Sequence, residues 1–381
     1  MKVLVLGAVG RAARAVISSL QFLGGIERIF LADHNAEALC KMTSDLRHLD
    51  VSPRYLDAEN DRSLYERMTE AGLVIGCLGP FHRHETRIVR TAIRAGRDYL
   101  SLCDDPGALQ EVLTLDAEAK RKGVRILCGC GLTPGLSNLL ARRAGAKLDS
   151  VETLEIAWFL DMGSNLGMAT LEHLLRSFGG KAPVCRDGRP AMTRAASWEE
   201  MVEFPSPVGW QVVSYLGHPE PITLTGSLPG VRDVWYKAGV GGKGKSLVLH
   251  SLAWMGEGEK TDLWLAALRT AASGIVRHGE GPCLSSVRVT ARGFKDGTPS
   301  NRILCASGEY YCLSGLVLAA AVESMLKTGW APGVYAPEDV LDQPSVFAWL
   351  GRAGLRILVG EENRRWPVED RPPGGERAPR P

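Results

Sequence analysis

The sequence has almost no net charge, no block of like charges and no uncharged stretch long enough to cross a membrane. Its 381 residues include 45 Lys and Arg and 43 Asp and Glu, which leaves a formal charge of +2. This balance gives no reason to expect a nucleic acid or an anionic membrane as a partner. The apolar, uncharged stretch over residues 315–321 is far shorter than the roughly 20 residues of a membrane-spanning helix. The apolar run in the opening MKVLVLGAVG is too brief for a secretory signal, so we expect a cytoplasmic protein.

Cysteine pairs at the spacing of zinc or redox sites are missing as well. Nine cysteines are scattered along the chain, and Cys128 and Cys130 form a C-x-C rather than a C-x-x-C. We interpret them as reduced thiols, most of them buried as small hydrophobic side chains. No local spacing of His, Cys and carboxylates supplies the three or four ligands of a zinc site, so the sequence predicts no metal.

Apolar residues at 45% and charged residues at 23% are typical of a globular protein with two or three domains. The first third alternates between strand and helix patterns. KVLVL (Lys2–Leu6) is a strand that ends in a glycine turn, a helix follows over residues 11–23, and a second strand ends at Asp33. This order predicts a Rossmann, doubly wound parallel sheet, in which ligands bind beyond the carboxyl ends of the strands.

The glycine turn predicts a site for a dinucleotide, although the same turn also precedes helices that bind nothing. It reads G-x-x-G-x-x-A, and its glycines allow the pyrophosphate to approach the start of a helix. Asp33 can accept both hydroxyls of the adenosine ribose and repel a 2′-phosphate, which predicts NAD in preference to NADP. Asp33 also fits the N-cap of a helix over residues 35–46, a role that is compatible with cofactor binding. The predicted cofactor contacts are Gly7, Ala8, Val9, Gly10, Asp33, His34, Asp57, Gly79, Pro80 and Phe81.

The candidate catalytic residues follow two further strands. Gly79-Pro80-Phe81 ends the strand over residues 73–78, and we interpret it as a wall for the nicotinamide ring, or else as a rigid turn. His82 and His84 come next, before a helix that we expect from about residue 85. They titrate near neutrality and are candidates for the acid/base, unless both are solvated on a loop. Asp104 is the next candidate, whereas Asp105 before Pro106 fits a helix N-cap.

The candidate substrate residues lie at a second helix start and in the second domain. Thr133 as N-cap and Pro134 as the first helical residue would direct the positive end of a helix at a substrate carboxylate. A well-capped helix without a ligand is the alternative. We expect the substrate between the strand ends and the second domain, where His218 and Lys237 would assist, although most lysines are solvated. The predicted substrate contacts are Gly131, Thr133, Pro134, Gly135, His218 and Lys237.

The pattern of the remaining chain predicts an α+β domain for substrate binding and dimerisation. Residues 286–292 and 301–306 read as an antiparallel hairpin, and we also expect a strand over 245–249 and a helix over 261–274. The helix over 315–326 is apolar on nearly all sides and should be buried. The expected domains are 1–135 completed by 315–358, then 136–314, with a disordered tail over 361–381.

Five stretches together resemble the saccharopine dehydrogenase-like proteins, which include L-lysine dehydrogenases and carboxynorspermidine synthases. The stretches are LVIGCLGPF (73–81), AIRAGRDYLSL (92–102), GCGLTPGLSNLLA (129–141), RDGRP (186–190) and PGVYAPEDVLDQPSVF (332–347). The usual Gly-Ala-Gly-x-x-Gly turn of that family is shortened here to Gly7-Ala8-Val9-Gly10, and its Asp-Arg is Asp33-His34. The resemblance implies NAD or NADP, a homodimer, and an amino-acid-like substrate.

Two functions follow from these observations. The first is an NAD(P)-dependent oxidoreductase that acts on a C–N bond (the CH–NH group) of an amino-acid-derived substrate, as saccharopine or lysine dehydrogenases do. The second is a nucleotide-binding regulatory or scaffolding protein that has the same fold without catalysis. Reduction of a carbonyl in place of an imine also fits the sequence.

Overall fold

The computed structural model describes residues 1–46, 50–161, 166–241 and 282–360, which form two compact units. The N-terminal unit consists of Met1–Gly131 and Tyr311–Val346, and the second unit of Leu132–Tyr310 and Phe347–Pro381. The segment expected to return to the first domain, 315–358, therefore falls in both units. The expected strand over 245–249, the helix over 261–274 and the tail over 361–381 lie outside the described residues.

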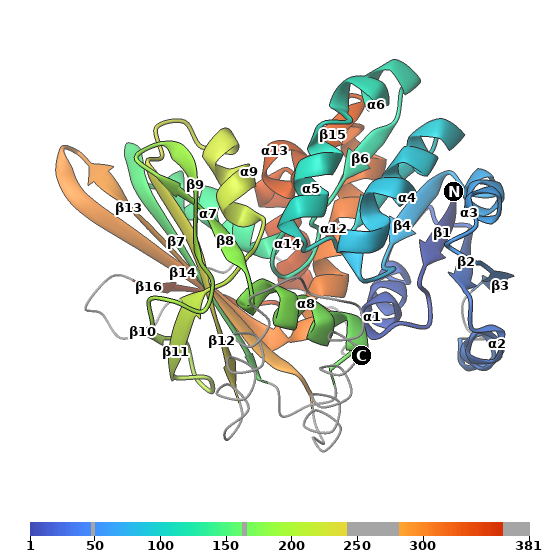
Figure 1. Cartoon of the computed structure of the whole chain (residues 1–381), viewed down its shortest axis with the longest axis horizontal. Helices are drawn as coiled ribbons and strands as arrows, with labels where there is room; N and C mark the ends of the chain where they lie inside the picture. Colours follow the sequence, from blue (N-terminus) through green and yellow to red (C-terminus); the bar gives the residue numbers. More distant parts are fainter. Residues whose placement is uncertain (47–49, 162–165, 242–281, 361–381) are drawn as a thin grey trace. The chain divides into compact units, whose positions relative to one another are not determined.

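The N-terminal unit is built on a seven-stranded parallel sheet of order β15-β6-β5-β4-β1-β2-β3 (Figure 1). Its strands are β1 (Lys2–Leu6), β2 (Arg28–Asp33), β3 (Val51–Tyr55), β4 (Leu73–Gly76), β5 (Asp98–Ser101), β6 (Arg125–Leu127) and β15 (Gly333–Tyr335). All four residues of β4 and the last four of β1 are buried, as both faces of a parallel sheet require. The predicted Rossmann fold is confirmed.

Helices cover both faces of this sheet. Leucines, valines and isoleucines of α3 (Asp61–Thr69), α4 (Phe81–Ala95) and α5 (Pro106–Leu113) enter one buried cluster with residues of the strands, and Figure 1 shows these helices side by side. The remaining helices of the unit are α1 (Arg11–Leu20), α2 (Ala36–Asp45), α6 (Asp116–Lys122), α12 (Tyr310–Thr328), α13 (Pro337–Val340) and α14 (Gln343–Arg352), whose last residues fall in the second unit. The chain between β5 and β6 forms two helices, α5 and α6.

Helix α12 is longer than the sequence suggested. Its 19 residues are long and apolar enough to cross a membrane, but 67% of its most apolar window is buried in the structure, as in the core helix of a soluble protein. A Cβ built on Gly315 would lie 2.6 Å from the backbone carbonyl of Ala15 in α1. The glycine therefore permits the close approach of the two helices, and the expectation of a buried helix is confirmed.

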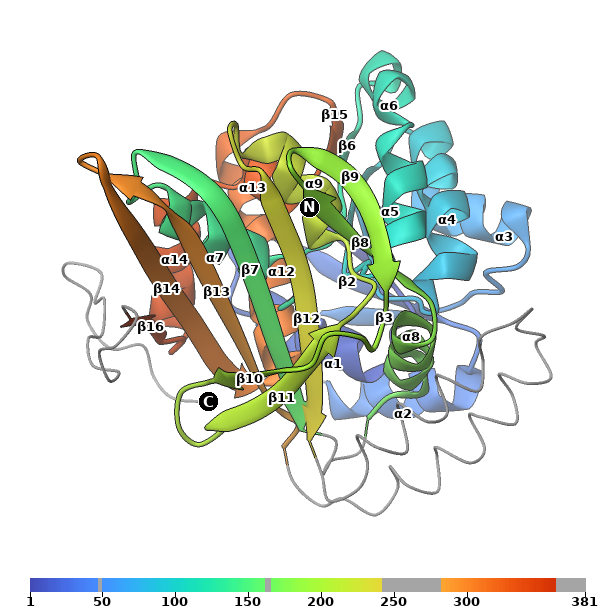
Figure 2. The same cartoon turned by 60° about the vertical axis from the view of Figure 1, so that its left-hand side comes forward.

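The second unit is an α+β structure around a nine-stranded mixed sheet (Figure 2). β7 (Ser150–Asp161) runs parallel to β12 (Asp233–Gly241) and antiparallel to β13 (Leu284–Lys295), which forms the expected hairpin with β14 (Thr298–Glu309). The remaining strands are β8 (Lys181–Arg186), β9 (Arg189–Arg194), β10 (Glu200–Glu203), β11 (Trp210–Tyr215) and β16 (Ile357–Gly360). Helices α7 (Leu136–Gly145) and α9 (Glu220–Ser227) pack on the sheet, and α8 (Met168–Phe178) contacts β8. The predicted class of this domain is confirmed.

Candidate functional site

The glycine turn between β1 and α1 uses most of its own N–H groups internally. Gly7 and Ala8 both donate to the carbonyl of Ala32, and Gly10 donates to the carbonyl of Gly7. The N–H of Val9 donates to Oδ2 of Asp33 at 3.2 Å. The donors that this loop offers to an anion are therefore those of the first turn of α1, because the first N–H groups of a helix have no partner within the helix.

The start of α1 is shaped for a negatively charged group. Gly10 is the N-cap residue and supplies no side-chain cap, and the first turn contains no acidic residue. The first residue of α1 is Arg11, whose side chain is exposed. The helix dipole favours a negative charge at this end of the helix. Gly7 has a φ of +72°, and a Cβ on it would lie 2.9 Å from the carbonyl oxygen of Cys77. The turn therefore requires glycine at this position and leaves open backbone at Gly10.

Asp33 is buried at the end of β2, and its carboxylate accepts the hydrogen bond from Val9 in the glycine turn. Its Oδ1 accepts the N–H of Asn35 at 3.1 Å and lies 3.2 Å from Nδ1 of the exposed His34. Asn35, not Asp33, caps α2, so the capping role expected for Asp33 is wrong. Asp57 is exposed in the loop after β3, where it accepts the N–H of Glu59.

Gly79 and Pro80 lie between β4 and α4, and Pro80 is the N-cap residue of the helix. The helix begins at Phe81, which packs partly against the core of the unit. His82 and His84 are therefore on the first turn of a helix and not on a loop before it, which corrects the expected start near residue 85. Nδ1 of His84 lies 3.2 Å from Oε1 of Glu59, outside hydrogen-bond alignment. Burial lowers the pKa of His84, and the charge of Glu59 offsets this only in part, so its imidazole is neutral at pH 7.

A fully buried carboxyl group, Glu85, lies one turn into α4. It accepts hydrogen bonds from Tyr99 Oη at 2.9 Å, Ser101 Oγ at 2.5 Å and Cys128 Sγ at 3.4 Å. Burial raises the pKa of Glu85 to about 7 despite these hydrogen bonds, and the negative charge of Asp104 adds to the rise. The side chain thus ties α4 to the carboxyl ends of β5 and β6, beside the loop that carries Asp104. Asp105 caps α5, as expected.

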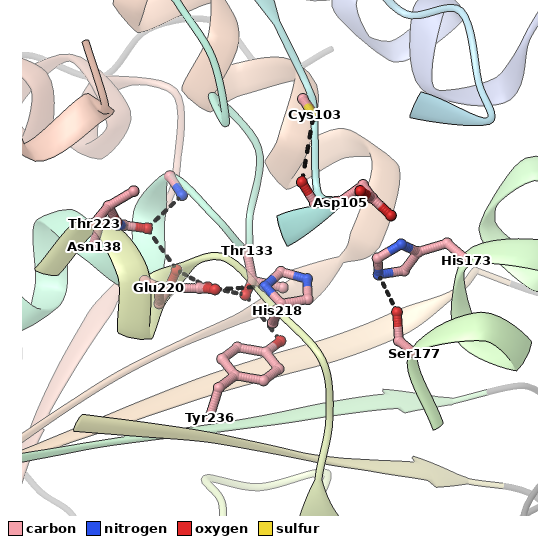
Figure 3. A network of polar contacts seen from close by, with 12 residues as sticks. Cys103, Asp105, Thr133, Asn138, His173, Ser177, His218, Glu220, Thr223 and Tyr236 are labelled. Carbon is pink, nitrogen blue, oxygen red and sulfur yellow. Dashed lines mark hydrogen bonds and ion pairs between the residues drawn. The ribbon is translucent and has the colours of Figure 1, made fainter. Parts of the chain in front are cut away.

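The predicted substrate residues are divided between the two units, since Gly131 ends a segment of the first and Thr133, Pro134 and Gly135 belong to the second. Helix α7 begins at Leu136 with Gly135 as the N-cap residue, so the N-cap role of Thr133 and the first-turn role of Pro134 are wrong. The cap is completed by the Asn138 side chain, which accepts the N–H of Gly135 at 2.9 Å. The hydroxyl of Thr133 is instead part of a buried polar network (Figure 3).

Glu220 is the centre of this network. It is fully buried at the start of α9, and its Oε1 accepts the hydroxyls of Thr133 at 2.5 Å and Ser137 at 2.7 Å. Its Oε2 lies 2.5 Å from Nδ1 of His218, which is 1% exposed. Burial opposes the charge of Glu220, but the charge of His218 and the hydrogen bonds of all three neighbours hold its pKa below the ordinary value. The Tyr236 hydroxyl lies 2.9 Å from Thr133 Oγ1, and its ring stacks on His218 at 4.3 Å.

Lys237 does not join this network. It follows Tyr236 on β12, and successive side chains of a strand point to opposite faces of the sheet. The ammonium group pairs with Glu200 at 2.9 Å and lies 5.1 Å from the centre of the Tyr215 ring. The expectation that Lys237 assists a ligand at Thr133 is therefore wrong.

The acceptor of the network and several of its hydroxyls were not predicted from the sequence, although signals for them were present. Glu220 stands two residues after His218 in GHPEP, and Tyr236 faces opposite to Lys237 by the alternation of a strand. Glu85 precedes Ile88 and Ala92 by three and seven residues, which places the carboxyl on the apolar face of its helix. Among the described residues no group of three or more His, Cys, Asp or Glu side chains is arranged to hold a metal ion. All nine cysteines lie in the described ranges, without a disulfide, and six are buried.

Comparison with known proteins finds one family model that matches part of the N-terminal unit. Residues 3–127 match the family described as the saccharopine dehydrogenase NADP binding domain. The fold resembles apo saccharopine dehydrogenase (L-Glu forming) from Saccharomyces cerevisiae, with 16% identity, a TM-score of 0.65 and coverage of 94% of this chain and 99% of that chain. The diaminopimelate (DAP) dehydrogenase of C. glutamicum is 11% identical with a TM-score of 0.46, covering 90% and 94% of the two chains.

A curated relative, a "Lipid droplet localized protein" of Caenorhabditis elegans, is 24% identical over 131 residues, which is 33% of this chain. The match spans 31% of the length of that relative. The family match and the shared fold confirm the resemblance to the saccharopine dehydrogenase-like proteins. Residues 3–127 of the N-terminal unit therefore match a dinucleotide-binding domain.

Proposed function

We propose that this chain, which resembles the saccharopine dehydrogenase-like proteins, is an NAD(P)-dependent oxidoreductase that acts on a C–N bond of an amino-acid-derived substrate. The observation that carries the proposal is the start of α1. An open glycine, unused helix N–H groups and an arginine meet there at the carboxyl end of a parallel sheet. Ligands of this fold bind at that edge.

The residues of this edge fit a dinucleotide. The first-turn N–H groups of α1 and Arg11 would hold the pyrophosphate, where helix dipole and guanidinium both favour negative charge. Gly10 presents no side chain, so that the backbone can be approached closely. Asp33 would accept the hydroxyls of the adenosine ribose. When bound, the nicotinamide supplies the chemistry of hydride transfer.

The preference of the protein for NADH or NADPH depends on Asp33. The family description names NADP, whereas a buried carboxylate at the end of β2 would repel a 2′-phosphate, and only the exposed His34 offers a compensating cation. We therefore expect NADH to bind more tightly than NADPH. Titration of both against intrinsic fluorescence measures the preference. Asp33→Asn should reduce or reverse it, and tighter binding of NADPH to the wild-type protein would contradict the role given to Asp33.

Oxidation of an amine requires a group that takes a proton from the substrate nitrogen before the hydride leaves the carbon. His82, His84 and Asp104 are the candidates from the N-terminal unit. His84 is neutral at pH 7 because burial lowers its pKa, so it is able to accept a proton. In the second unit, the buried network around Glu220 and His218 offers hydrogen-bonding groups for a polar substrate.

The proposal is tested by following NAD(P)H fluorescence with a panel of substrates. Lysine, saccharopine and other amino-acid secondary amines are supplied with NAD+ or NADP+, and mixtures of amine and aldehyde or keto acid with the reduced cofactors. Turnover that depends on the amine supports the proposed reaction. Tight dinucleotide binding without turnover of any amine or imine would overturn it and favour the nucleotide-binding regulatory function.

A further inference from the structure

The order of the strands divides the carboxyl edge of the parallel sheet into two halves. The chain passes from β1 through β2 to β3 on one side, and from β4 through β5 to β6 on the other side of β1. A dinucleotide in this fold lies across the point where the order reverses, with one nucleotide over each half. The glycine turn and Asp33 belong to the half that receives the adenosine. The nicotinamide half of the edge is therefore formed by the ends of β4, β5 and β6.

Glu85 connects the carboxyl ends of these three strands. Its side chain, fully buried on α4, accepts hydrogen bonds from Tyr99 and Ser101 of β5 and from Cys128 directly after β6. The last residue of β4 makes room for the Tyr99 hydroxyl, because a Cβ on Gly76 would collide with it. A single carboxyl group thus fixes the ends of β4, β5 and β6 relative to one another.

The network of Glu85 extends into the loops that follow β5 and β6. The N–H of Cys103 donates to Ser101 Oγ at 3.4 Å, and the N–H of Cys130 donates to the carbonyl of Ser101 at 2.8 Å. Asp104 follows Cys103 directly, and its negative charge acts on Glu85. The hydrogen bonds of Glu85 therefore set the course of the loop that carries Asp104.

This network accommodates Glu85 both with and without a proton. The ionised carboxyl accepts from all three of its neighbours. When the carboxyl is protonated, the Tyr99 hydroxyl can rotate and accept the proton, because a phenol both donates and accepts. Burial raises the pKa of Glu85 to about 7, and the charge of Asp104 adds to the rise. Both forms are therefore present near pH 7, and a new charge at this edge shifts their ratio.

The other ionisable groups next to the carboxyl keep one protonation state near neutral pH. Burial raises the pKa of one phenol and of four thiols, which therefore stay neutral. These groups are Tyr99, Cys77, Cys103, Cys128 and Cys130. On the first turn of α4, His84 is also neutral at pH 7, because burial lowers its pKa.

Charged side chains on the helices around α4 have partners of their own. The pairs are Thr86 with Glu111 of α5, Arg87 with Glu59 and with Asp61 of α3, and Lys120 with Asp116 on α6. In this network, Glu85 is therefore the group that titrates near neutrality.

From this arrangement we propose that Glu85 is the positioning residue of the nicotinamide half of the site, and that its carboxyl releases a proton when the oxidised cofactor binds and regains one when the cofactor is reduced. NAD+ carries one positive charge on its ring that NADH lacks. A positive charge over the ends of β4, β5 and β6 favours the ionised form of the carboxyl that joins them. The inference rests on the proposed function and adds a residue to the set expected from the sequence.

The protons balance as follows. When NAD+ binds, the O–H bond of the Glu85 carboxyl breaks, and its proton goes to the solvent. Reduction by a hydride, which brings both electrons, cancels the charge of the ring, and the carboxylate takes up a proton from the solvent. Glu85 forms no bond with cofactor or substrate, so its role is to hold the strand ends and to respond to their charge.

Two variants separate these two parts of the role. Gln has the shape of the protonated carboxyl and can keep all three hydrogen bonds, since its amide donates to Tyr99. Glu85→Gln should therefore bind NADH within about twofold of wild type. Glu85→Ala removes the tie between the strand ends and should weaken NADH binding about tenfold. ADP, which has no nicotinamide, should bind to both variants as it binds to wild type.

Asp98→Asn is the matched control, because Asp98 joins two of the same strands at their opposite ends. It is the first residue of β5, and its carboxylate accepts the N–H of Arg125, the first residue of β6, at 2.8 Å and pairs with the guanidinium. We expect Asp98→Asn to lower the Tm and to leave NADH affinity unchanged. Equal losses of NADH affinity in Asp98→Asn and Glu85→Ala would overturn the positioning role.

Calorimetric titration in two buffers of different ionisation enthalpy measures the proton. At pH 7 the wild-type protein should release more protons on binding NAD+ than on binding NADH, and this difference should vanish in Glu85→Gln. A positive charge lowers the pKa of the carboxyl, so NAD+ binds better to the ionised form. From about pH 5.5 to about pH 8.5, the affinity for NAD+ relative to NADH should rise about tenfold in wild type, which corresponds to one pKa unit. In Glu85→Gln this ratio should stay constant.

The inference and the proposed function fail in different ways. A ratio of affinities that is constant with pH in wild type, or that changes equally in Glu85→Gln, would overturn the proton exchange by Glu85. Should Glu85→Ala fail to fold, Ser101→Ala removes one of the three hydrogen bonds and should weaken NADH binding while ADP binding is kept. Equal losses for both ligands would overturn the positioning role. Absence of turnover with every amine and imine overturns the proposed reaction and leaves the inference standing, because binding alone measures it.

Discussion

At the scale of single residues, Glu85 is the group whose protonation couples most directly to folding. Three side chains donate to its carboxyl, yet burial raises its pKa from 4.5 to about 7. Between these two values the folded protein binds more protons at this group than the unfolded chain does. The contribution of Glu85 to stability is therefore complete below pH 4.5 and is lost as the pH rises through 7.

Replacement of Glu85 by Gln should remove this dependence. Between pH 4.5 and 7.5, we expect the wild-type protein to lose on the order of 3 kcal/mol of unfolding free energy relative to Glu85→Gln. Urea titrations at a series of pH values measure it. Parallel pH profiles for the two proteins would show that Glu85 has an ordinary pKa in the folded state.

Two glycines of the same turn separate folding from cofactor binding. Gly7 has a left-handed φ and no room for a Cβ, so Gly7→Ala should destabilise the protein by on the order of 1–3 kcal/mol. Gly10 has φ −64° and ψ 154°, which any residue adopts, and its added Cβ would meet Gly7 O at 3.1 Å. Gly10→Ala should leave the Tm within a few degrees and weaken NADH binding about tenfold. Equal affinities for wild type and Gly10→Ala would show that the pyrophosphate does not approach this backbone.

At the scale of elements, the start of α1 is expected to bind through charge as well as through its N–H groups. Arg11→Gln should weaken NADH binding about fivefold at low salt. The loss should shrink towards 1 M salt, where the screening length is about 3 Å. Fluorescence titrations at several salt concentrations measure both effects. Arg62→Gln is the control, because its exposed pair with Glu66 lies on α3 of the same unit. An equal loss of NADH affinity in both variants would indicate that the net charge of the protein, and not the position of Arg11, causes the effect.

The sequence best predicts those helices and strands whose pattern of apolar residues continues over the whole element. The parallel strands, the hairpin of β13 and β14, and the buried helix α12 follow from apolar patterns that alternate, run on continuously or surround a helix. The edge strand β3 has none of these patterns: VSPRY contains a proline and alternates poorly. Helix boundaries depend on a few hydrogen bonds, which is why α4 begins at Phe81 and the cap of α7 involves Asn138 instead of Thr133.

The two candidate sites differ in how far apart their residues lie in the sequence. The glycine turn and Asp33 are close together in the sequence pattern of strand, turn, helix and strand, so this pattern predicts them as candidates. The network of Glu220 joins residues from α7 and the segment before it, from α9 and from β12, and Thr133 and Tyr236 are 103 positions apart. Only the folded chain brings them together. Lys237 is the opposite case. Its residue type suits a substrate carboxylate, but its side chain lies on the other face of β12 from Tyr236 and the network.

At the scale of the whole molecule, a dinucleotide that binds only the folded state must stabilise it. At a concentration of a hundred times Kd the gain is about 2.7 kcal/mol, which corresponds to a rise in Tm of roughly 5–10 °C for a unit of this size. Thermal unfolding with and without NADH measures it, and adenosine, which lacks the pyrophosphate, is the control. An unchanged Tm with saturating NADH and NADPH would contradict the assignment of the N-terminal unit.

The position of β15 in the sheet has a consequence for synthesis on the ribosome. This strand pairs with β6 at the end of the parallel sheet, yet residues 132–310, which belong to the second unit, lie between their segments. Until Gly333–Tyr335 has been made, the growing chain exposes β6 as an open edge with unpaired amide and carbonyl groups. Such edges recruit other strands, and chains lengthen by only about 5–20 residues per second. The nascent protein therefore passes through an interval of many seconds in which β6 is an open edge of the parallel sheet and is exposed to pairing with other chains.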